Sequence, residues 1–246
     1  MVDGSMKRVM IVDALNAYFR AYIVNPSLSV HGQPIGGLKG FLGILQKLCR
    51  DINPDSIVIV WDGPGGSRKR REQNKNYEEG RKPIRVNRPS NLSMEEQQAN
   101  MAWQQIRLVE YLNELPVIQF RFDEIEADDI IAYLTQTQQF EGWEKVIVSN
   151  DKDFIQLCEG VPRAGLKSIA KNLNFLREDK DVTLKDIFRF CENVDSKAKF
   201  FSNVLEYQDI VISNYKLMQL YAPAISLQSK EKVNYALDNF EYDYNK

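Results

Sequence analysis

The sequence of 246 residues has little of the histidine and cysteine on which much metal and thiol chemistry depends. It contains one histidine, His31, and three cysteines that lie far apart without a Cys-x-x-Cys pair. This scarcity argues against a disulfide framework, a cysteine zinc site and any mechanism that needs two histidines. No apolar run approaches the roughly 18 to 20 residues of a membrane span. We expect a cytoplasmic protein, and we interpret residues 1–5 as a cloning remnant before a native Met6.

The composition that is present is typical of a globular protein. Hydrophobic residues make up 43% of the chain and charged residues 27%, which is enough to bury a substantial core. The length suits one large domain, or one α/β core with a small appended module. The formal net charge of −2 is nearly balanced, so the total charge says little about binding partners.

Four short runs rich in β-branched residues predict buried strands, at residues 8–13, 56–62, 116–120 and 144–151. Their continuous apolarity is typical of a parallel sheet that is covered on both faces. Helical patterns lie between them, at 38–49, 94–115 and 128–138. This alternation predicts an α/β fold with a doubly wound, mostly parallel sheet over residues 6–157.

Capping boxes mark the starts of two predicted helices. Ser93 with Glu96 precedes the helical pattern at 94–115, and Thr183 with Asp186 precedes another further along the chain. From residue 158 the pattern is mostly helical, with a last helix near 230–237. We therefore expect residues 158–246 to form a smaller helical region.

Carboxylates follow the predicted strands and should gather at one edge of the sheet, because ligand sites of open α/β sheets lie at the carboxyl ends of their strands. The candidates are Asp13, Asp62, Glu126, Asp128, Asp129, Asp151 and Asp153. Like charges about 4 Å apart repel by roughly 4 kcal/mol at an effective dielectric near 20, so bound cations would relieve the crowding. All-oxygen ligation favours Mg²⁺ or Mn²⁺ over zinc. The alternative is that Asp13 and Asp151 are helix caps or turn formers, and that residues 126–129 only cap a helix.

A strongly basic segment follows Asp62 and runs from Arg68 to Arg88. Three acidic residues oppose its nine basic ones, which are Arg68, Lys69, Arg70, Arg71, Lys75, Arg81, Lys82, Arg85 and Arg88. Glycines and prolines flank the segment, so we expect a mobile loop or a helical arch. Lysine and arginine neutralise phosphates and Tyr77 can stack on a base, which predicts a nucleic-acid partner. The alternative is a solvated surface.

A glycine-rich stretch, Gly160-Val161-Pro162-Arg163-Ala164-Gly165-Leu166-Lys167-Ser168, stands before a predicted helix. Backbone N–H groups there can hold a phosphate, although a Gly-Pro turn before an ordinary helix has the same sequence pattern. The stretch does not match the nucleotide-binding loop, because Gly165 and Lys167 are not adjacent and no strand leads into it.

Five motifs in this order resemble the 5′-nuclease superfamily: Ile11-Val12-Asp13, Trp61-Asp62-Gly63, Glu126-Ala127-Asp128-Asp129, Ser149-Asn150-Asp151-Lys152-Asp153 and Gly160-Val161-Pro162. That superfamily includes phage 5′ to 3′ exonucleases, flap endonucleases and the 5′-nuclease domain of bacterial DNA polymerase I. The resemblance covers residues 7 to about 172. The rest is loosely similar to the helical end of phage nucleases that remove RNA primers.

The resemblance implies a PIN-like fold and a metal-dependent phosphodiesterase that acts on 5′ ends or flaps during replication. It implies two Mg²⁺ ions, with Mn²⁺ as a substitute. We expect the first ion at Asp13, Asp62, Glu126 and Asp128, and the second at Asp129, Asp151 and Asp153. It also implies a helix-hairpin-helix with a bound K⁺.

The implied partner is branched or nicked duplex DNA with a 5′ single strand, bound by a monomer in the cytoplasm, which is the host cytoplasm for a phage protein. Single-stranded-DNA-binding or other replication proteins are further partners that the resemblance implies. The DNA-binding residues would be Arg68, Lys69, Arg70, Arg71, Lys75, Tyr77, Arg81, Lys82, Gly160, Gly165, Lys167 and Ser168.

The chain departs from the superfamily pattern at three places. Tyr77-Glu78 stands where relatives carry Tyr-Lys, so we expect Arg81 or Lys82 to take the role of the catalytic lysine. Arg163 replaces the glycine of the hairpin. Only Cys158 and Glu159 separate Leu157 from Gly160, where relatives place a few dozen residues with an Asp-x-x-Asp pair of metal ligands.

The short spacing leaves two explanations open: the protein lacks this segment, or the written sequence omits it. We expect omission, because a deletion would join two intact motifs while removing the ligands between them. Two other functions remain as alternatives, a catalytically impaired branched-DNA-binding protein and a single-strand ribonuclease of PIN type. The sequence does not separate exonuclease from flap endonuclease preference, or RNA from DNA in the cleaved strand.

Overall fold

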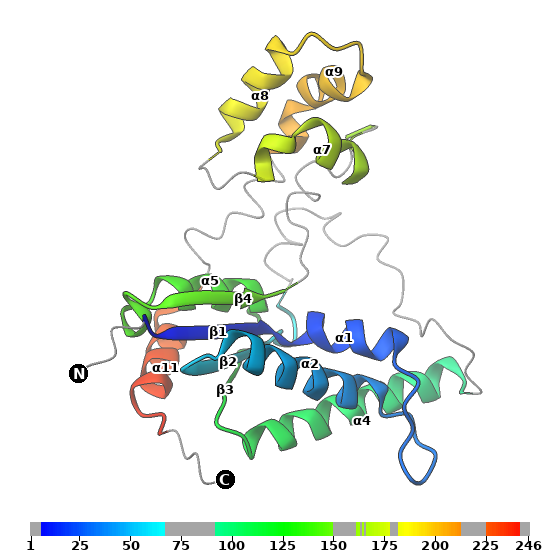
Figure 1. Ribbon diagram of the computed structural model, residues 1–246, viewed down its shortest axis with the longest axis vertical. Helices are drawn as coiled ribbons and strands as arrows, with labels where there is room; N and C mark the ends of the chain where they lie inside the picture. Colours follow the sequence, from blue (N-terminus) through cyan, green and yellow to red (C-terminus); the bar gives the residue numbers. More distant parts are fainter. Residues whose placement is uncertain are drawn as a thin grey trace. The chain divides into compact units, whose positions relative to one another are not determined.

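The computed structural model describes residues 6–66, 92–149, 161–162, 164, 166–177, 182–212 and 225–241. They belong to two compact units (Figure 1). The first contains a β-sheet and its covering helices, and the second contains α7, α8 and α9.

The sheet of the first unit has four strands in the order β3-β2-β1-β4, and each neighbouring pair is parallel. The strands are β1 (Arg8–Asp13), β2 (Ser56–Trp61), β3 (Ile118–Arg121) and β4 (Glu144–Val148). The register pairs Asp13 with Val60 and Val12 with Val148. All four predicted strands are therefore confirmed, and the carboxyl ends of β1, β2 and β4 lie at the same edge.

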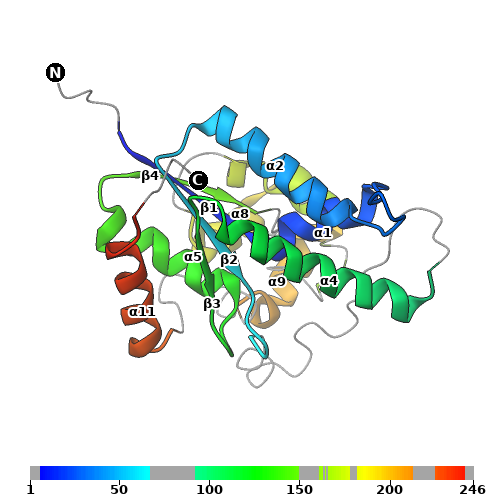
Figure 2. The same cartoon turned by 90° about the horizontal axis from the view of Figure 1, so that it is seen from below.

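Helices cover both faces of this sheet, as a doubly wound fold requires (Figure 2). On one face lie α1 (Ala14–Val24), α2 (Gly36–Ile52) and α4 (Met94–Asn113). On the other face lie α5 (Ala127–Gln136) and α11 (Leu227–Asp238). Alternate residues of β1 serve the two cores: Met10 packs with the first group of helices and Ile11 with the second.

The strands differ in how deeply they are buried. Met10 and Ile11 of β1 have no exposed surface, whereas β4 stands at the edge of the described sheet and leaves 51% of Ile147 exposed. Burial on both faces is expected for every strand, and it holds for the two central ones except at Arg8 and Ile57, which are partly exposed. An edge strand has a neighbour on one side only, which leaves its side chains less covered.

Helix α11 belongs to the first unit, although it comes from the far end of the described chain. Val233 is fully buried against the core that α5 forms with the sheet. Asn234 accepts a hydrogen bond of 2.9 Å from the Tyr133 hydroxyl, and Gln139 donates one of 3.1 Å to Asp238. The division differs here from the expected helical region at 158–246, because the apolar face of α11 packs on α5 and on the short helix η1 (Gln138–Phe140).

The second unit is built from α7 (Leu166–Asn172), η2 (Asn174–Arg177), α8 (Leu184–Asn193) and α9 (Lys199–Glu206). Ile187, Phe200 and Val204 lie in its core. Both predicted capping boxes are present, one of them at the start of α8 and the other at the start of α4. No helix among the described residues is long and apolar enough to cross a membrane.

Candidate metal and nucleic-acid site

Asp13 ends β1 and caps the helix that follows it directly. Its Oδ1 accepts a hydrogen bond of 3.2 Å from the Asn16 N–H in the first turn of α1. Its Oδ2 accepts one of 2.9 Å from the Ser149 hydroxyl, at the end of the neighbouring strand β4. The side chain is 7% exposed. The capping role weighed for Asp13 is thus real, and it does not exclude a role as a metal ligand, because a carboxylate has about four lone-pair sites.

Asp62 follows β2 and caps a helix that is distant in sequence. Its Oδ1 accepts a hydrogen bond of 2.8 Å from the N–H of Ala127, the first residue of α5 and 65 positions away. Glu126 holds the N-cap position of α5, but it is Asp62 that accepts from the first turn of that helix. Glu126 thus makes no side-chain cap bond, and the capping that was weighed as the alternative role of residues 126–129 is supplied in part by Asp62.

The same hydrogen bond brings the start of α5, which carries further acidic residues, to Asp62. Glu126 precedes Ala127 and is 9% exposed, while Asp128 and Asp129 are half-buried in the first turn of α5. Negative side chains are favoured at this position by the partial positive charge of a helix N-terminus. The N-terminus of α5 therefore offsets part of the negative charge of these acidic residues, so that each of them does not need its own cation.

The backbone after β2 crosses the backbone after β3 at very close range. Gly63 N–H donates to the Ile125 carbonyl at 3.1 Å, and Glu124 N–H donates to the Pro64 carbonyl at 2.9 Å. A Cβ atom at Gly63 would lie 1.6 Å from the Phe122 carbonyl oxygen, so only glycine fits. This crossing fixes the position of Asp62, and the basic segment begins within a few residues of it.

The first turns of α4, which follow the basic segment in sequence, are held by α1. The hydroxyls of Tyr18 and Tyr22 donate to the carbonyls of Met101 and Gln97, at 3.2 and 3.3 Å. Burial raises the pKa of Tyr18, so its hydroxyl stays protonated and remains a donor. Both flanks of the basic segment are thus attached to the unit that carries the carboxylates.

Several of the expected site residues share the carboxyl edge of the sheet: Asp13, Asp62, Glu126, Asp128 and Asp129. Within the part of the chain that the structure describes, no group of three or more such side chains is arranged to hold a metal ion. Asp151 and Asp153, which were expected to add ligands, lie outside the described residues. The described donors fit a hard cation in kind, since all of them are carboxylate oxygens.

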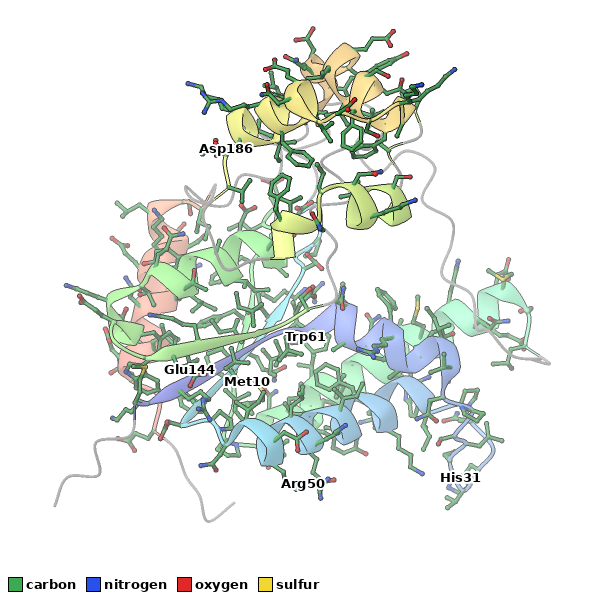
Figure 3. The ribbon with its side chains drawn as sticks, turned by 45° about the horizontal axis from the view of Figure 1, so that its top comes forward. Met10, His31, Arg50, Trp61, Glu144 and Asp186 are labelled. Atoms are coloured by element: carbon green, nitrogen blue, oxygen red, sulfur yellow. The ribbon has the colours of Figure 1, made fainter. Side chains whose placement is uncertain are left out.

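His31 is placed away from this edge. Figure 3 shows Trp61 at the end of β2 that leads into Asp62, while His31 lies on the loop between α1 and α2. The single histidine is therefore not among the candidate ligands, in agreement with the composition.

The family match covers most of the chain. The model of the 5′-3′ exonuclease N-terminal resolvase-like domain matches residues 8–183. The chain belongs to this family. The match includes all four strands and α7, and it confirms the superfamily on which the sequence motifs agreed.

Named relatives of this family member are nucleases and polymerases. It is 33% identical to a flap endonuclease Xni of Shewanella over 62% of this chain and 52% of the relative. It is 28% identical to a 5′-3′ exonuclease of Aquifex aeolicus over 62% of this chain and 48% of the relative. With DNA polymerase I of Caldicellulosiruptor bescii the identity is 26% over 83% of this chain and 21% of the relative. The chain thus spans about half, or less, of these relatives' length.

Solved structures show the same fold. T5 5′-exonuclease with zinc ions bound matches with a TM-score of 0.59 and 14% identity, over 95% of this chain and 99% of that one. The T5 D15 protein co-crystallised with metal ions matches with a TM-score of 0.58 and 15% identity, over the same shares. The PIN-like doubly wound fold is therefore confirmed.

The predicted DNA-binding residues lie mostly outside the described part of the family member. This applies to Arg68, Lys69, Arg70, Arg71, Lys75, Tyr77, Arg81, Lys82, Gly160 and Gly165. Lys167 and Ser168 belong to α7, where Ser168 is half-buried. The junction of Leu157 with Gly160 is also outside, so both explanations of its short spacing stay open.

Two contacts at the motifs were not expected from the sequence. Ser149 belongs to the motif at residues 149–153, and its hydroxyl donates a hydrogen bond to Asp13. Asn203 of α9 donates to the Pro162 carbonyl of the glycine-rich stretch at 2.6 Å. The sequence signal for the first contact was a serine at the end of a predicted strand that neighbours the strand of Asp13. The second contact joins residues 41 positions apart, and no pattern in the sequence indicates it.

Proposed function

We propose that this member of the 5′-3′ exonuclease family hydrolyses phosphodiester bonds at 5′ ends or flaps of branched or nicked DNA. The observation that carries the proposal is the arrangement of Asp13 and Asp62 at the ends of neighbouring parallel strands, with α5 held to Asp62 through Ala127. This arrangement brings the carboxylates of three separate chain segments to one sheet edge.

The cofactor in this proposal is a pair of divalent cations, Mg²⁺ with Mn²⁺ as a substitute. The donors would be Asp13, Asp62, Glu126 and Asp128 for one ion, and Asp129, Asp151 and Asp153 for the other. Bound metal would supply a water of lowered pKa and neutralise charge on the leaving oxygen. The protein's own part is to hold the oxygen donors rigidly, which the bonds from Asn16, Ser149 and Ala127 do for Asp13 and Asp62.

The basic segment would bind the 5′ single strand. Its flanks are attached to the unit that carries the carboxylates, on one side through Gly63 and Pro64 next to Asp62 and on the other through the hydrogen bonds between α4 and α1. Arg81 or Lys82 would offset negative charge at the scissile phosphate. Gly160, Gly165, Lys167 and Ser168 would contact the duplex backbone.

The direct test is a cleavage assay with 5′-flap DNA in the presence of Mg²⁺. Single-stranded RNA serves as the alternative substrate, and a reaction with EDTA serves as the metal-free control. Asp62→Asn keeps an oxygen that accepts from the Ala127 N–H but removes the charge, so cleavage should fall at least about 100-fold while DNA affinity stays equal or rises. Asp55→Asn is the matched control, because Asp55 accepts a 2.7 Å bond from the Arg8 N–H at the opposite end of the sheet. Equal losses in both variants would contradict the assignment.

The basic segment has its own test in the salt dependence of binding. Changing Arg81 and Lys82 together to glutamine should weaken binding of a 5′ single strand more than of plain duplex. The slope of log affinity against log salt should flatten by nearly two ion equivalents. The control is a variant in which Lys47 and Arg50 on α2 are both changed to glutamine. An unchanged slope in the Arg81 and Lys82 variant would show that the basic segment is solvated surface and does not bind DNA.

One observation favours a second candidate, a catalytically impaired branched-DNA-binding protein. The two residues between Leu157 and Gly160 leave no room for the additional ligands that the resemblance implies. Tight branched-DNA binding without cleavage, together with an intact mass equal to that of the 246 residues, would establish this function. Cleavage of RNA alone would instead support the single-strand ribonuclease.

A further inference from the structure

Ser149 connects the carboxyl ends of β4 and β1 through a side-chain hydrogen bond. It follows β4, and the pairing of Val12 with Val148 places it beside Asp13. Its hydroxyl donates to Asp13 Oδ2 at 2.9 Å, while Oδ1 of the same carboxylate accepts from Asn16 N–H. Asp13 is therefore held from its own helix and from a neighbouring strand.

The second hydrogen bond does more than cap a helix. The Asn16 bond alone satisfies α1, but it leaves the carboxylate able to turn about its terminal torsion, which is a broad one. A donor at the other oxygen fixes the plane of the carboxylate group, and with it the directions in which its oxygens can bind a ligand. Because Ser149 is exposed, this bond adds little to folding stability.

We propose that Ser149 is a positioning residue, whose hydroxyl holds the Asp13 carboxylate in the orientation that binds a divalent cation. The inference rests on the proposed function, because it takes Asp13 to be a metal donor. Groups that hydrogen-bond to metal ligands fix the ligands' orientation, and their loss typically weakens metal affinity or activity about 10- to 100-fold.

The test is a calorimetric titration of the full chain with Mn²⁺ in the absence of DNA. Ser149→Ala should weaken Mn²⁺ affinity about 10-fold, the lower end of the range for such groups, and leave the thermal unfolding midpoint of the metal-free protein unchanged. Ser149→Thr keeps the hydroxyl and should restore the affinity. Ser202→Ala is the control, since Ser202 donates to the Lys199 carbonyl in the other unit.

Three results would overturn the inference: wild-type affinity in Ser149→Ala, a loss in Ser149→Thr as large as in Ser149→Ala, or no Mn²⁺ binding by the wild type. Cleavage of a 5′-flap DNA, measured on the same samples, separates the two proposals. Wild-type protein that binds Mn²⁺ in a Ser149-dependent way but cleaves no DNA refutes the proposed function alone. Cleavage with unaltered Mn²⁺ affinity in Ser149→Ala refutes the positioning role alone.

Discussion

The carboxyl ends of β1 and β2 lie side by side and carry the same residue type, yet they are stabilised in different ways. Asp13 caps the helix that follows it and accepts from Asn16, three residues on. Asp62 caps α5, whose first residue is 65 positions away. One strand end is organised by neighbouring sequence and the other by a long-range crossing.

This difference shows how a sheet edge can gather charge without a matching set of cations. Asp13 is oriented by donors from α1 and β4, and Asp62 by the N-terminus of α5. Peptide and hydroxyl donors stabilise each carboxylate in its charged form without a paired cation. If the two strand ends differ in this way, substitutions at each of them should have different effects on stability.

The largest expected effect is at the crossing that supports Asp62. Gly63→Ala puts a Cβ atom 1.6 Å from the Phe122 carbonyl oxygen, so the two backbones must separate. We expect a loss of about 3 kcal/mol or more in the free energy of unfolding, measured with urea. Gly43→Ala in α2 is the control: nothing lies within 4 Å of the added atom, and it should stabilise by about 0.5–1 kcal/mol. Similar unfolding midpoints for the two variants would show that the backbones at Gly63 and Phe122 do not approach each other so closely.

Serine substitutions distinguish the local cap from the long-range one. Serine is a good N-cap, so Asp13→Ser should change the free energy of unfolding by less than about 0.5 kcal/mol. A serine at 62 is too short to reach Ala127, whose N–H would then lack its acceptor, at a cost of about 1–3 kcal/mol. Urea unfolding in EDTA measures both, and equal effects would remove the distinction.

The support that α1 gives to α4 should be worth less than the crossing. Tyr18→Phe deletes the hydroxyl that donates to the Met101 carbonyl, and Tyr18 is fully buried. The free energy of unfolding should fall by about 1 kcal/mol. Tyr235→Phe is the control because Tyr235 is 72% exposed, and a loss as large there would show a general effect of tyrosine removal.

The smallest effects belong to the exposed capping boxes of the two units. Hydrogen bonds from Ser93 lower the pKa of Glu96, and those from Thr183 lower the pKa of Asp186. A carboxyl group with a lowered pKa in the folded state stabilises above its unfolded pKa, and that contribution is lost as pH falls through the folded pKa.

Glu96→Gln and Asp186→Asn should therefore lower the thermal midpoint slightly at pH 7. The gap from wild type should close as pH falls below the ordinary values of 4.5 for Glu96 and 3.8 for Asp186. Differential scanning calorimetry at pH 7, and again below those ordinary pKa values, measures the difference in thermal midpoint between each variant and the wild type. A gap that persists at low pH would mean that the boxes act through packing rather than charge.

The sequence predicted those elements whose signals are local. The β-branched runs identified all four strands, and serine or threonine with an acidic residue three positions later located the starts of α4 and α8. Helices α1 and α9 were not predicted. Their aromatic and β-branched residues, such as Tyr18 and Phe200, have weaker helix propensity, and burial in the two cores stabilises them instead.

The sequence by itself determined which residues stand at strand ends, because strand periodicity and the parallel fold place Asp13 and Asp62 at one edge. Only the tertiary structure decided that Asp62 caps α5, that Ser149 holds Asp13 and that α11 covers the sheet. Each of these contacts joins residues at least 65 positions apart. Local propensity acts over a few residues, whereas such contacts form only when packing brings distant segments within hydrogen-bonding distance.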